Sequence, residues 1–251
     1  MEPVPYRGSL ALNFARGRGL PAESMRTWMR AAGRYLPPGF APILDLGAGS
    51  GRFSRALADQ FGVPVLAVEP SAEMRQRYRR AFTRPVHLVG GRAEELPCAD
   101  GSVKAVWASQ VIHHIADAGA CAAQLRRVLW PSGRLLIRGG FEDVERIPPL
   151  HRYFPALRRM ATEGASALSS MRAALARVGL RELAHEVVGQ VSAASLVEFY
   201  DQARLRARSP LLRLTDEEFA DGLARLRAAV AAGETDGPVI DQVDLVVFGA
   251  G

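Results

Sequence analysis

Residues 43–52 have the composition of a turn that holds a ligand against the protein backbone. The run reads Ile-Leu-Asp-Leu-Gly-Ala-Gly-Ser-Gly-Arg, with glycine at every second position from Gly47 to Gly51, where an apolar strand passes into a helix. Backbone without Cβ can turn this tightly and let a ligand approach closely. The N-terminus of the following helix adds amide donors and a partial positive charge, which suit a carboxylate. The run predicts a ligand site, although a tight connection without a ligand has the same pattern.

Glu69 and the spacing of the glycines narrow the class of ligand. Glu69 ends a second apolar strand, where a carboxylate can accept both hydrogen bonds of a ribose diol. The usual dinucleotide pattern has its third glycine three residues after the second, and that position is Arg52 here. The spacing therefore disfavours an NAD-dependent enzyme.

Two adjacent histidines, His113 and His114, follow the fourth apolar strand. The carboxyl edge of a parallel sheet is where such folds bind ligands, and imidazole can transfer protons near neutral pH. We expect at least one of the two, His113 before His114, to act as a general base. For each, a structural histidine bonded to backbone is the alternative.

The elements that must position these residues follow an alternating order. Short apolar runs alternate with helical patterns, which is typical of βαβ units around a parallel sheet and predicts an α/β fold. Pro148, Pro149 and Pro155 predict a loop over the strand ends. We expect strands at 43–46, 65–69, 86–89, 103–109, 134–138, 183–191 and 243–248, and helices at 52–61, 72–82, 118–129, 166–178, 193–208 and 215–232.

The composition excludes several classes of protein. The net charge is +6, but all cations except Lys104 are arginines scattered along the chain, so nucleic acid is not an expected partner. The sequence lacks an apolar run long enough to span a membrane and a signal-peptide pattern, so we expect a cytoplasmic protein without a membrane partner. Two cysteines and the absence of ligand spacing argue against a metal site.

Together these residues resemble the class I S-adenosylmethionine (SAM)-dependent methyltransferases, in particular the group acting on small molecules. The resemblance covers about residues 40–140. It rests on Asp45–Gly51, on Glu69, on the Gly-Arg-Ala-Glu-Glu-Leu-Pro-Cys loop at 91–98 and on 111–114.

The resemblance implies a Rossmann-like, doubly wound, mostly parallel seven-stranded sheet with an antiparallel last strand and a helical insertion. It also implies SAM as the cofactor. Arg92 stands where the family usually has an aspartate near the adenine, and Lys104 stands where the fourth strand usually has one. The expected cofactor-binding residues are Asp45, Gly47, Ala48, Gly49, Gly51, Glu69, Pro70, Arg92, Ala93, Glu94 and Gln110.

The length of 251 residues fits one domain more easily than two. Within it we expect an N-terminal helical lid at 1–40, a SAM-binding core at 41–140, a lid and helical insertion at 141–242 that form the substrate wall, and the last strand at 243–251. The candidate substrate residues are Phe14, Arg18, His151, Tyr153 and Tyr200.

The expected function is methyl transfer from SAM to an oxygen, nitrogen or carbon atom of a small molecule, as in natural-product tailoring. The alternatives are an RNA- or protein-modifying methyltransferase and a SAM-binding protein with altered chemistry. The sequence fixes neither the acceptor nor the oligomeric state.

Overall fold

A computed structural model describes residues 20–78, 85–141, 148–234 and 237–250 of the chain. The chain forms two compact units, each assembled from three stretches of sequence. The larger unit comprises 28–141, 164–188 and 244–251, and the smaller unit comprises 1–27, 142–163 and 189–243. The sequence predicted one domain made of four consecutive segments, and this stays a prediction.

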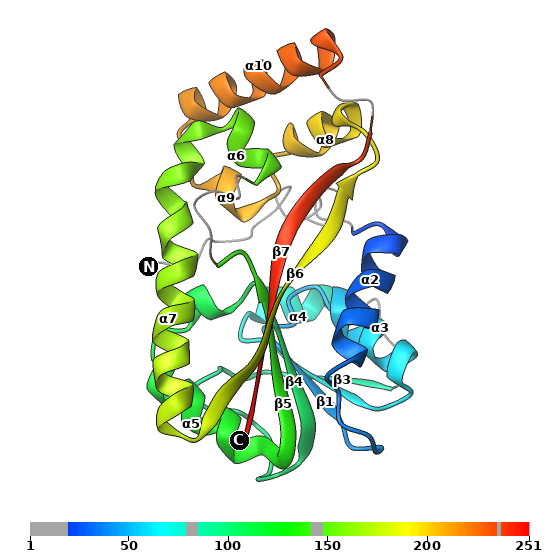
Figure 1. Cartoon of the computed structure of the whole chain (residues 1–251), viewed down its shortest axis with the longest axis vertical. Helices are drawn as coiled ribbons and strands as arrows, with labels where there is room; N and C mark the ends of the chain where they lie inside the picture. The colour runs from blue at the N-terminus through cyan, green and yellow to red at the C-terminus, as the bar shows by residue number, and fades with distance from the viewer. Residues whose placement is uncertain (1–19, 79–84, 142–147, 235–236, 251) are drawn as a thin grey trace. The chain divides into compact units, whose positions relative to one another are not determined.

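The sheet has the predicted class and topology (Figure 1). Its strand order is β3-β2-β1-β4-β5-β7-β6; β1 to β5 run parallel in their pairings, and β7 is antiparallel to β5. This order confirms the Rossmann-like seven-stranded sheet with an antiparallel last strand. The strands are β1 (Ile43–Leu46), β2 (Val65–Val68), β3 (Val86–Val89), β4 (Val103–Ser109), β5 (Leu129–Gly139), β6 (Leu180–Ala193) and β7 (Val239–Ala250).

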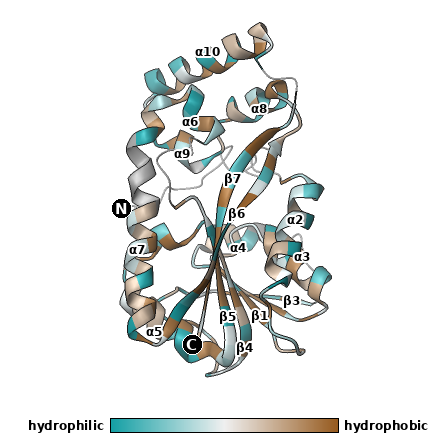
Figure 2. Cartoon of the chain, in the orientation of Figure 1, coloured by the Kyte–Doolittle hydropathy of each residue, from teal (hydrophilic) through white to brown (hydrophobic). Residues whose placement is uncertain are grey.

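Helices cover both faces of the parallel strands, which explains why the central strands β1 and β4 are buried along almost their whole length and are mostly apolar (Figure 2). Trp107 of β4 faces α2 (Ala22–Gly33) and α3 (Arg52–Phe61), because its ring contacts those of Trp28 and Phe53. Successive side chains of a strand point to opposite faces. Val106, the neighbour of Trp107 on β4, therefore lies on the opposite face of the sheet. It belongs to an apolar core cluster with residues of α5 (Ala118–Val128) and α7 (Ala161–Arg177).

Several predicted elements differ in detail from the observed ones: for example, β6 extends beyond the predicted 183–191, and α7 begins before the predicted 166. The segment with Pro148, Pro149 and Pro155 is helical, forming α6 (Pro149–Tyr153) and the 3₁₀ helix η2 (Pro155–Met160). Proline fits the first turn of a helix because its missing N–H would have no partner there. The strand predicted at 134–138 begins at Leu129, which pairs with Val103 ahead of a register shift.

The smaller unit has its own apolar core. Phe154, Phe199, Leu211 and Leu226 are buried in it. Ser195 caps α8 (Leu196–Ala203), so this helix is shorter than the predicted 193–208, and α9 (Ser209–Leu212) follows separately. Thr215 and Glu218 form a capping box at the start of α10 (Asp216–Ala232), close to the predicted 215–232.

Lys104 has a structural contact within the larger unit. Its ammonium donates to the carbonyl of Gly39 at 2.6 Å, and the residue is buried. Burial lowers the pKa of Lys104 because the charged form loses hydration. Lys104 therefore ties β4 to the segment that precedes β1.

Candidate functional site

The glycine run forms a left-handed turn between β1 and α3. Gly47, Gly49 and Gly51 have φ angles of 67°, 57° and 75°, which side chains with Cβ rarely adopt. A Cβ on Gly47 would lie 2.5 Å from Cγ2 of Val111, so the segment after β4 packs directly on this turn. Gly51 is the N-cap residue of α3, and no side-chain hydrogen bond caps this helix. The hydrogen-bond donors at the N-terminus of α3 are therefore backbone N–H groups.

Glu69, one residue beyond β2, is fixed opposite this turn. Its Oε2 accepts from the N–H of Gly49 and its Oε1 accepts from the N–H of Ser71, both at 2.9 Å. Arg75 donates to the carbonyls of Glu69 and Pro70 at 2.8 and 2.7 Å. A carboxylate oxygen can accept more than one hydrogen bond, so both oxygens retain capacity for hydroxyl donors.

Asp45 lies beneath the turn as a buried acid. Its carboxyl accepts a hydrogen bond from the hydroxyl of Ser54 on α3. Burial raises the pKa of Asp45 to about 7; the hydrogen bond from Ser54 opposes this, and the nearby charge of Glu69 adds to it. Asp45 thus ties β1 to α3 beneath the turn.

The raised pKa of Asp45 predicts a pH dependence of stability. Between pH 3.8 and about 7 the folded protein keeps a proton that the unfolded chain has released, so stability is full below this window and falls as the pH rises through it. Asp45→Asn stays neutral and still accepts from Ser54. Relative to this variant, the wild type should lose on the order of 1 kcal/mol of unfolding free energy per pH unit. Urea unfolding across the window measures this, and parallel pH curves would contradict it.

The loop between β3 and β4 carries the residues expected near the adenine. Ala93 is buried, and Oε1 of Glu94 accepts from the N–H of Ala116 at 3.0 Å. Nε of Arg92 lies 3.6 Å from Oε2 of Glu94, and 68% of the Arg92 side chain is exposed. An exposed guanidinium next to a fixed carboxylate can still stack on a planar ring.

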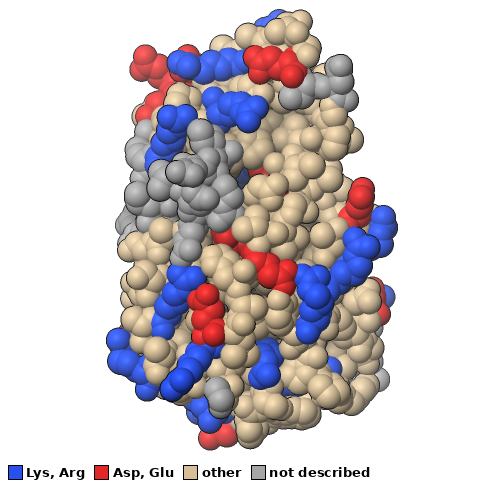
Figure 3. All heavy atoms as spheres, viewed as in Figure 1, with Lys and Arg blue, Asp and Glu red and all other residues tan. Residues whose placement is uncertain are grey.

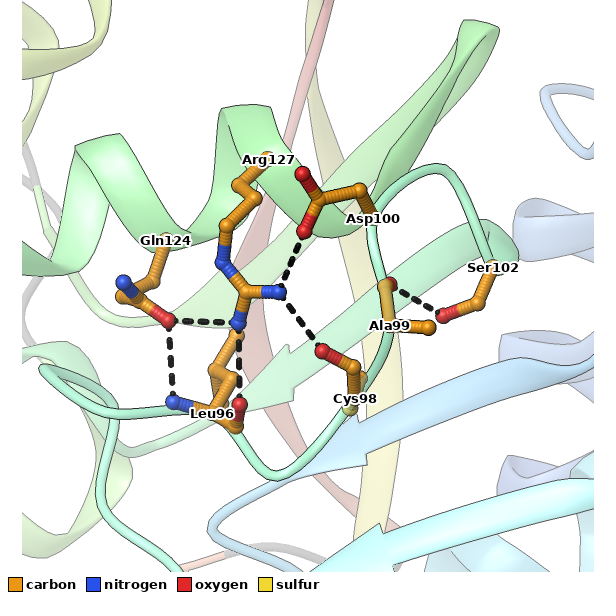
Figure 4. A network of polar contacts seen from close by, with 7 residues as sticks. All are labelled: Leu96, Cys98, Ala99, Asp100, Ser102, Gln124 and Arg127. Atoms are coloured by element: carbon orange, nitrogen blue, oxygen red, sulfur yellow. Dashed lines mark hydrogen bonds and ion pairs between the residues drawn. The ribbon is translucent and has the colours of Figure 1, made fainter.

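Arg127 of α5 clamps the end of the same loop (Figure 4). Its Nη1 donates to the carbonyl of Cys98 at 2.6 Å and to Oδ1 of Asp100 at 2.8 Å, and its Nη2 donates to the carbonyl of Leu96 at 2.9 Å. Gln124 Oε1 accepts from Arg127 Nη2 at 2.7 Å and from the N–H of Leu96 at 3.1 Å. The clamp fixes the backbone that follows Glu94.

Gln110 stands at the carboxyl end of β4 in a conformation that is uncommon for a residue with a side chain. Its φ is 55°, and its N–H donates to the carbonyl of Arg138 on β5 at 2.8 Å. Such strain persists where neighbouring structure imposes it, and it clusters at functional sites. Gln110 is exposed at the sheet edge where a cofactor was expected.

His113 and His114 lie in the 3₁₀ helix η1 (Ile112–His114) that follows β4. His113 is half-buried and His114 is exposed, and their ring centroids are 4.1 Å apart. Val111, which packs on Gly47, immediately precedes this helix, so the histidines start from a segment in contact with the glycine turn. The structure therefore brings them to the same sheet edge as Glu69 and Gln110.

Of the five predicted substrate residues, three are described by the structure, and these three lie in the smaller unit. Phe14 and Arg18 lie outside the described residues. In the smaller unit Tyr153 is buried in the core cluster, Tyr200 is partly buried against it and His151 is half-buried. Burial in the core gives Tyr153 a packing role.

The sequence reasoning missed Ser54, Arg75, Arg127 and Gln124. Ser54 occupies a position on α3 nine residues after Asp45, and Arg127 reaches carbonyls about thirty residues earlier in the chain. Contacts between a side chain and a distant backbone carbonyl leave no local pattern. Arg75, six residues after Glu69, lies close enough in sequence that a helix start at Ser71 could have suggested it.

Charge and hydropathy give the setting of the site. On the face drawn in Figure 3, basic side chains form several separate groups with acidic ones between them. Within the described ranges, no helix is long and apolar enough to cross a membrane. The same residues contain no group of three or more His, Cys, Asp or Glu side chains that could hold a metal ion.

Comparison with known proteins identifies the region that contains this site. Residues 44–137 match the model of a methyltransferase domain family. An uncharacterized methyltransferase of Mycobacterium tuberculosis is 38% identical over 129 residues, which are 51% of this chain and 49% of that protein. The glycine/sarcosine/dimethylglycine N-methyltransferase of Actinopolyspora halophila is 29% identical over 173 residues, 66% of this chain and 30% of that protein. The chain thus spans half or less of these curated relatives.

The fold extends over most of a solved structure. An Anabaena variabilis protein, assigned as a methyltransferase from an antibiotic biosynthesis pathway, superposes with a TM-score of 0.64 at 22% identity. The superposition covers 87% of this chain and 95% of that one. At this identity the likeness is one of fold.

Proposed function

We propose that this chain, which belongs through residues 44–137 to the class I SAM-dependent methyltransferases, transfers the methyl group of SAM to a small-molecule acceptor. The observation that carries the proposal is the Glu69 carboxylate, whose oxygens accept the N–H groups of Ser71 and of Gly49 in the turn with positive φ angles. This pairing of a fixed diol acceptor with a glycine turn at a helix N-terminus suits a nucleoside that carries an amino-acid tail.

The residues present fit SAM in their donor chemistry. The N-terminus of α3 suits the methionine carboxylate, and Glu69 suits the ribose hydroxyls. The N–H groups of Gly47, Ala48 and Gly49 already donate to Val68 and Glu69, so these residues would border the methionine part through close backbone approach. Ala93 and Glu94, with Arg92 beside them, would line the adenine, and Pro70 and Gln110 would lie along the nucleoside and methionine parts. When bound, SAM supplies an activated methyl group. The chain's own tasks are to orient the acceptor and to accept a proton from it where one must leave.

The small-molecule class is supported by the named activity of the Actinopolyspora halophila relative, whose acceptors are glycine and its methylated derivatives. We propose His113, with His114 beside it, as the general base, and the half-buried His151 and Tyr200 as acceptor contacts, with Phe14 and Arg18 of the N-terminal segment. Tyr153 is proposed only as a support for these.

Ligand-dependent stability provides the first test. We expect SAM and S-adenosylhomocysteine to stabilise the protein by about 2.7 kcal/mol at one hundred times the dissociation constant, and NADH not to. Differential scanning fluorimetry with the three ligands measures this. Stabilisation by NADH without stabilisation by SAM would contradict the proposal.

Methyl transfer itself is tested with SAM labelled in its methyl group and a metabolite extract. Label should appear in a small organic product, and S-adenosylhomocysteine should accumulate with it. Label in RNA or protein would favour the alternative substrate classes. SAM binding without any labelled product would favour a SAM-binding protein with other chemistry.

A further inference from the structure

Arg138, near the carboxyl end of β5, is a buried charged residue to which the proposed function gives no role. Only 3% of it is exposed. Its guanidinium carbon lies over two aromatic rings, 4.5 Å from the centroid of Trp28 on α2 and 5.3 Å from that of Phe53 on α3. Such cation–π contacts are favourable for a planar guanidinium. The two rings therefore fix the place of the Arg138 guanidinium on the face of the sheet that α2 and α3 cover.

Arg138 contacts the end of β4 through both its side chain and its backbone. The pairing of the two strands places Ser109 of β4 beside Arg138 in register. Nη1 of Arg138 donates to the hydroxyl oxygen of Ser109 at 3.1 Å, and the carbonyl of Arg138 accepts from the N–H of Gln110 at 2.8 Å. One residue of β5 thus holds two consecutive residues at the point where β4 ends.

The end of β4 adjoins the glycine turn. The pairing of β4 with β1 ends one residue before Ser109 on β4 and one residue before Gly47 on β1. Val111, which follows Gln110, packs on Gly47. Gln110 itself has a φ of 55°, and a residue with a side chain keeps such a conformation only where the surrounding structure imposes it. The contacts of Arg138 are part of the structure that imposes it.

We propose that Arg138 is a positioning residue of the cofactor site, because its guanidinium holds Ser109 and so keeps the end of β4 in the conformation that binds SAM. The inference rests on the proposed function, in which Gln110 lines the cofactor. Without the guanidinium, Ser109 loses a hydrogen-bond donor, and Gln110 can relax toward the φ values that side chains prefer. The binding-competent conformation is then only partly populated, and the apparent affinity falls by that fraction.

Arg138→Met tests the inference, because it keeps an unbranched apolar chain and removes every N–H donor of the guanidinium. Replacing a buried charged group by an apolar one of similar volume is often neutral or stabilising, so the melting temperature should not fall. The affinity for S-adenosylhomocysteine, measured by isothermal calorimetry, should fall about 10-fold. Wild-type affinity in Arg138→Met would overturn the inference. Weaker binding together with a melting temperature several degrees below that of the wild type would also overturn it, because the role would then be one in the fold.

A conservative variant and a matched control make the result specific. Arg138→Lys keeps a positive charge and N–H donors, so it should recover part of the affinity that Arg138→Met loses. Arg134→Met changes an arginine near the start of the same strand, whose Nη1 donates to the carbonyls of Ser132 and Gly133, and it should bind S-adenosylhomocysteine as the wild type does. Equal losses in Arg138→Met and Arg138→Lys, or the same loss in Arg134→Met, would count against the inference.

A double-mutant cycle tests whether Arg138 acts through Ser109. Ser109→Ala removes the oxygen that accepts from the guanidinium, so it should weaken binding of S-adenosylhomocysteine by a similar factor. The double variant Arg138→Met/Ser109→Ala should bind about as weakly as either single variant, since both changes break the same contact. Losses that multiply in the double variant would mean that the two residues act independently, which contradicts the inference.

The inference and the proposed function fail separately. A wild-type protein that does not bind S-adenosylhomocysteine would contradict the proposed function. Normal binding by the wild type, together with unchanged affinity in Arg138→Met, would contradict the role of Arg138 alone.

Discussion

Replacing Glu69 by alanine should weaken SAM binding by about 10²-fold, which corresponds to about 2.7 kcal/mol. The carboxylate has two tasks: it accepts the N–H groups of Gly49 and Ser71, and it is the proposed partner of the ribose hydroxyls. Hydrogen bonds to a charged group contribute about 1.5–3 kcal/mol each, so losing them at once removes both the contact and the shape of the turn. Isothermal calorimetry with S-adenosylhomocysteine measures the affinity directly.

Two further variants make this result specific. Glu69→Gln keeps one acceptor oxygen, so it should bind better than Glu69→Ala and worse than the wild type. Glu73→Ala removes an exposed acid in the first turn of α4 (Ala72–Tyr78), four residues away, and should bind normally. Unchanged affinity in Glu69→Ala would remove this residue from the cofactor site.

The glycine turn and its acid were predictable because each depends on one local requirement. Positive φ at Gly47, Gly49 and Gly51 needs glycine, and a strand that ends in Glu69 brings a carboxylate to the carboxyl edge of the sheet. The parallel strands were predictable for a related reason. They are covered on both faces and are therefore mostly apolar, so their positions can be predicted from hydropathy.

The parts that sequence reasoning missed depend on contacts between distant segments. The prolines after residue 147 predicted a loop, but Pro149 is in the first turn of α6 and Pro155 starts η2, because the smaller unit buries Phe154 and Tyr153 between them. Burial is also what gives Tyr153 a packing role. A proline at a helix start and one in a loop look alike until the partner of the apolar residue is known.

The packing of the smaller unit could not be predicted from the sequence for the same reason. Its core joins residues far apart in sequence, such as Phe154 of the segment between α6 and η2 and Leu226 of α10. The hydroxyl of Ser192 on β6 likewise donates to Asp241 on β7. These contacts are not local, so no periodicity or spacing predicts them.

The histidine pair should give the largest effect on turnover. If His113 is the general base, His113→Asn should lower kcat by ~10² to 10⁴-fold at neutral pH while SAM affinity stays nearly unchanged. The reason is that an amide cannot accept a proton from the acceptor, whereas the glycine turn and Glu69 are untouched. The two rings lie 4.1 Å apart, so the double variant His113→Asn/His114→Asn shows whether His114 carries any of the residual rate.

Single and double variants, assayed for turnover and for cofactor affinity, distinguish catalysis from structure. His87→Asn changes an exposed histidine on β3 and should leave turnover intact. Wild-type turnover should also fall in acid, where a protonated imidazole has no free lone pair, and the residual rate of the double variant should not show this decline. If the double variant keeps near-normal turnover with an unchanged pH profile, the acceptor needs no imidazole base. Methyl transfer would then depend on how well this chain holds the acceptor in line with the methyl group, which is a matter of proximity and orientation.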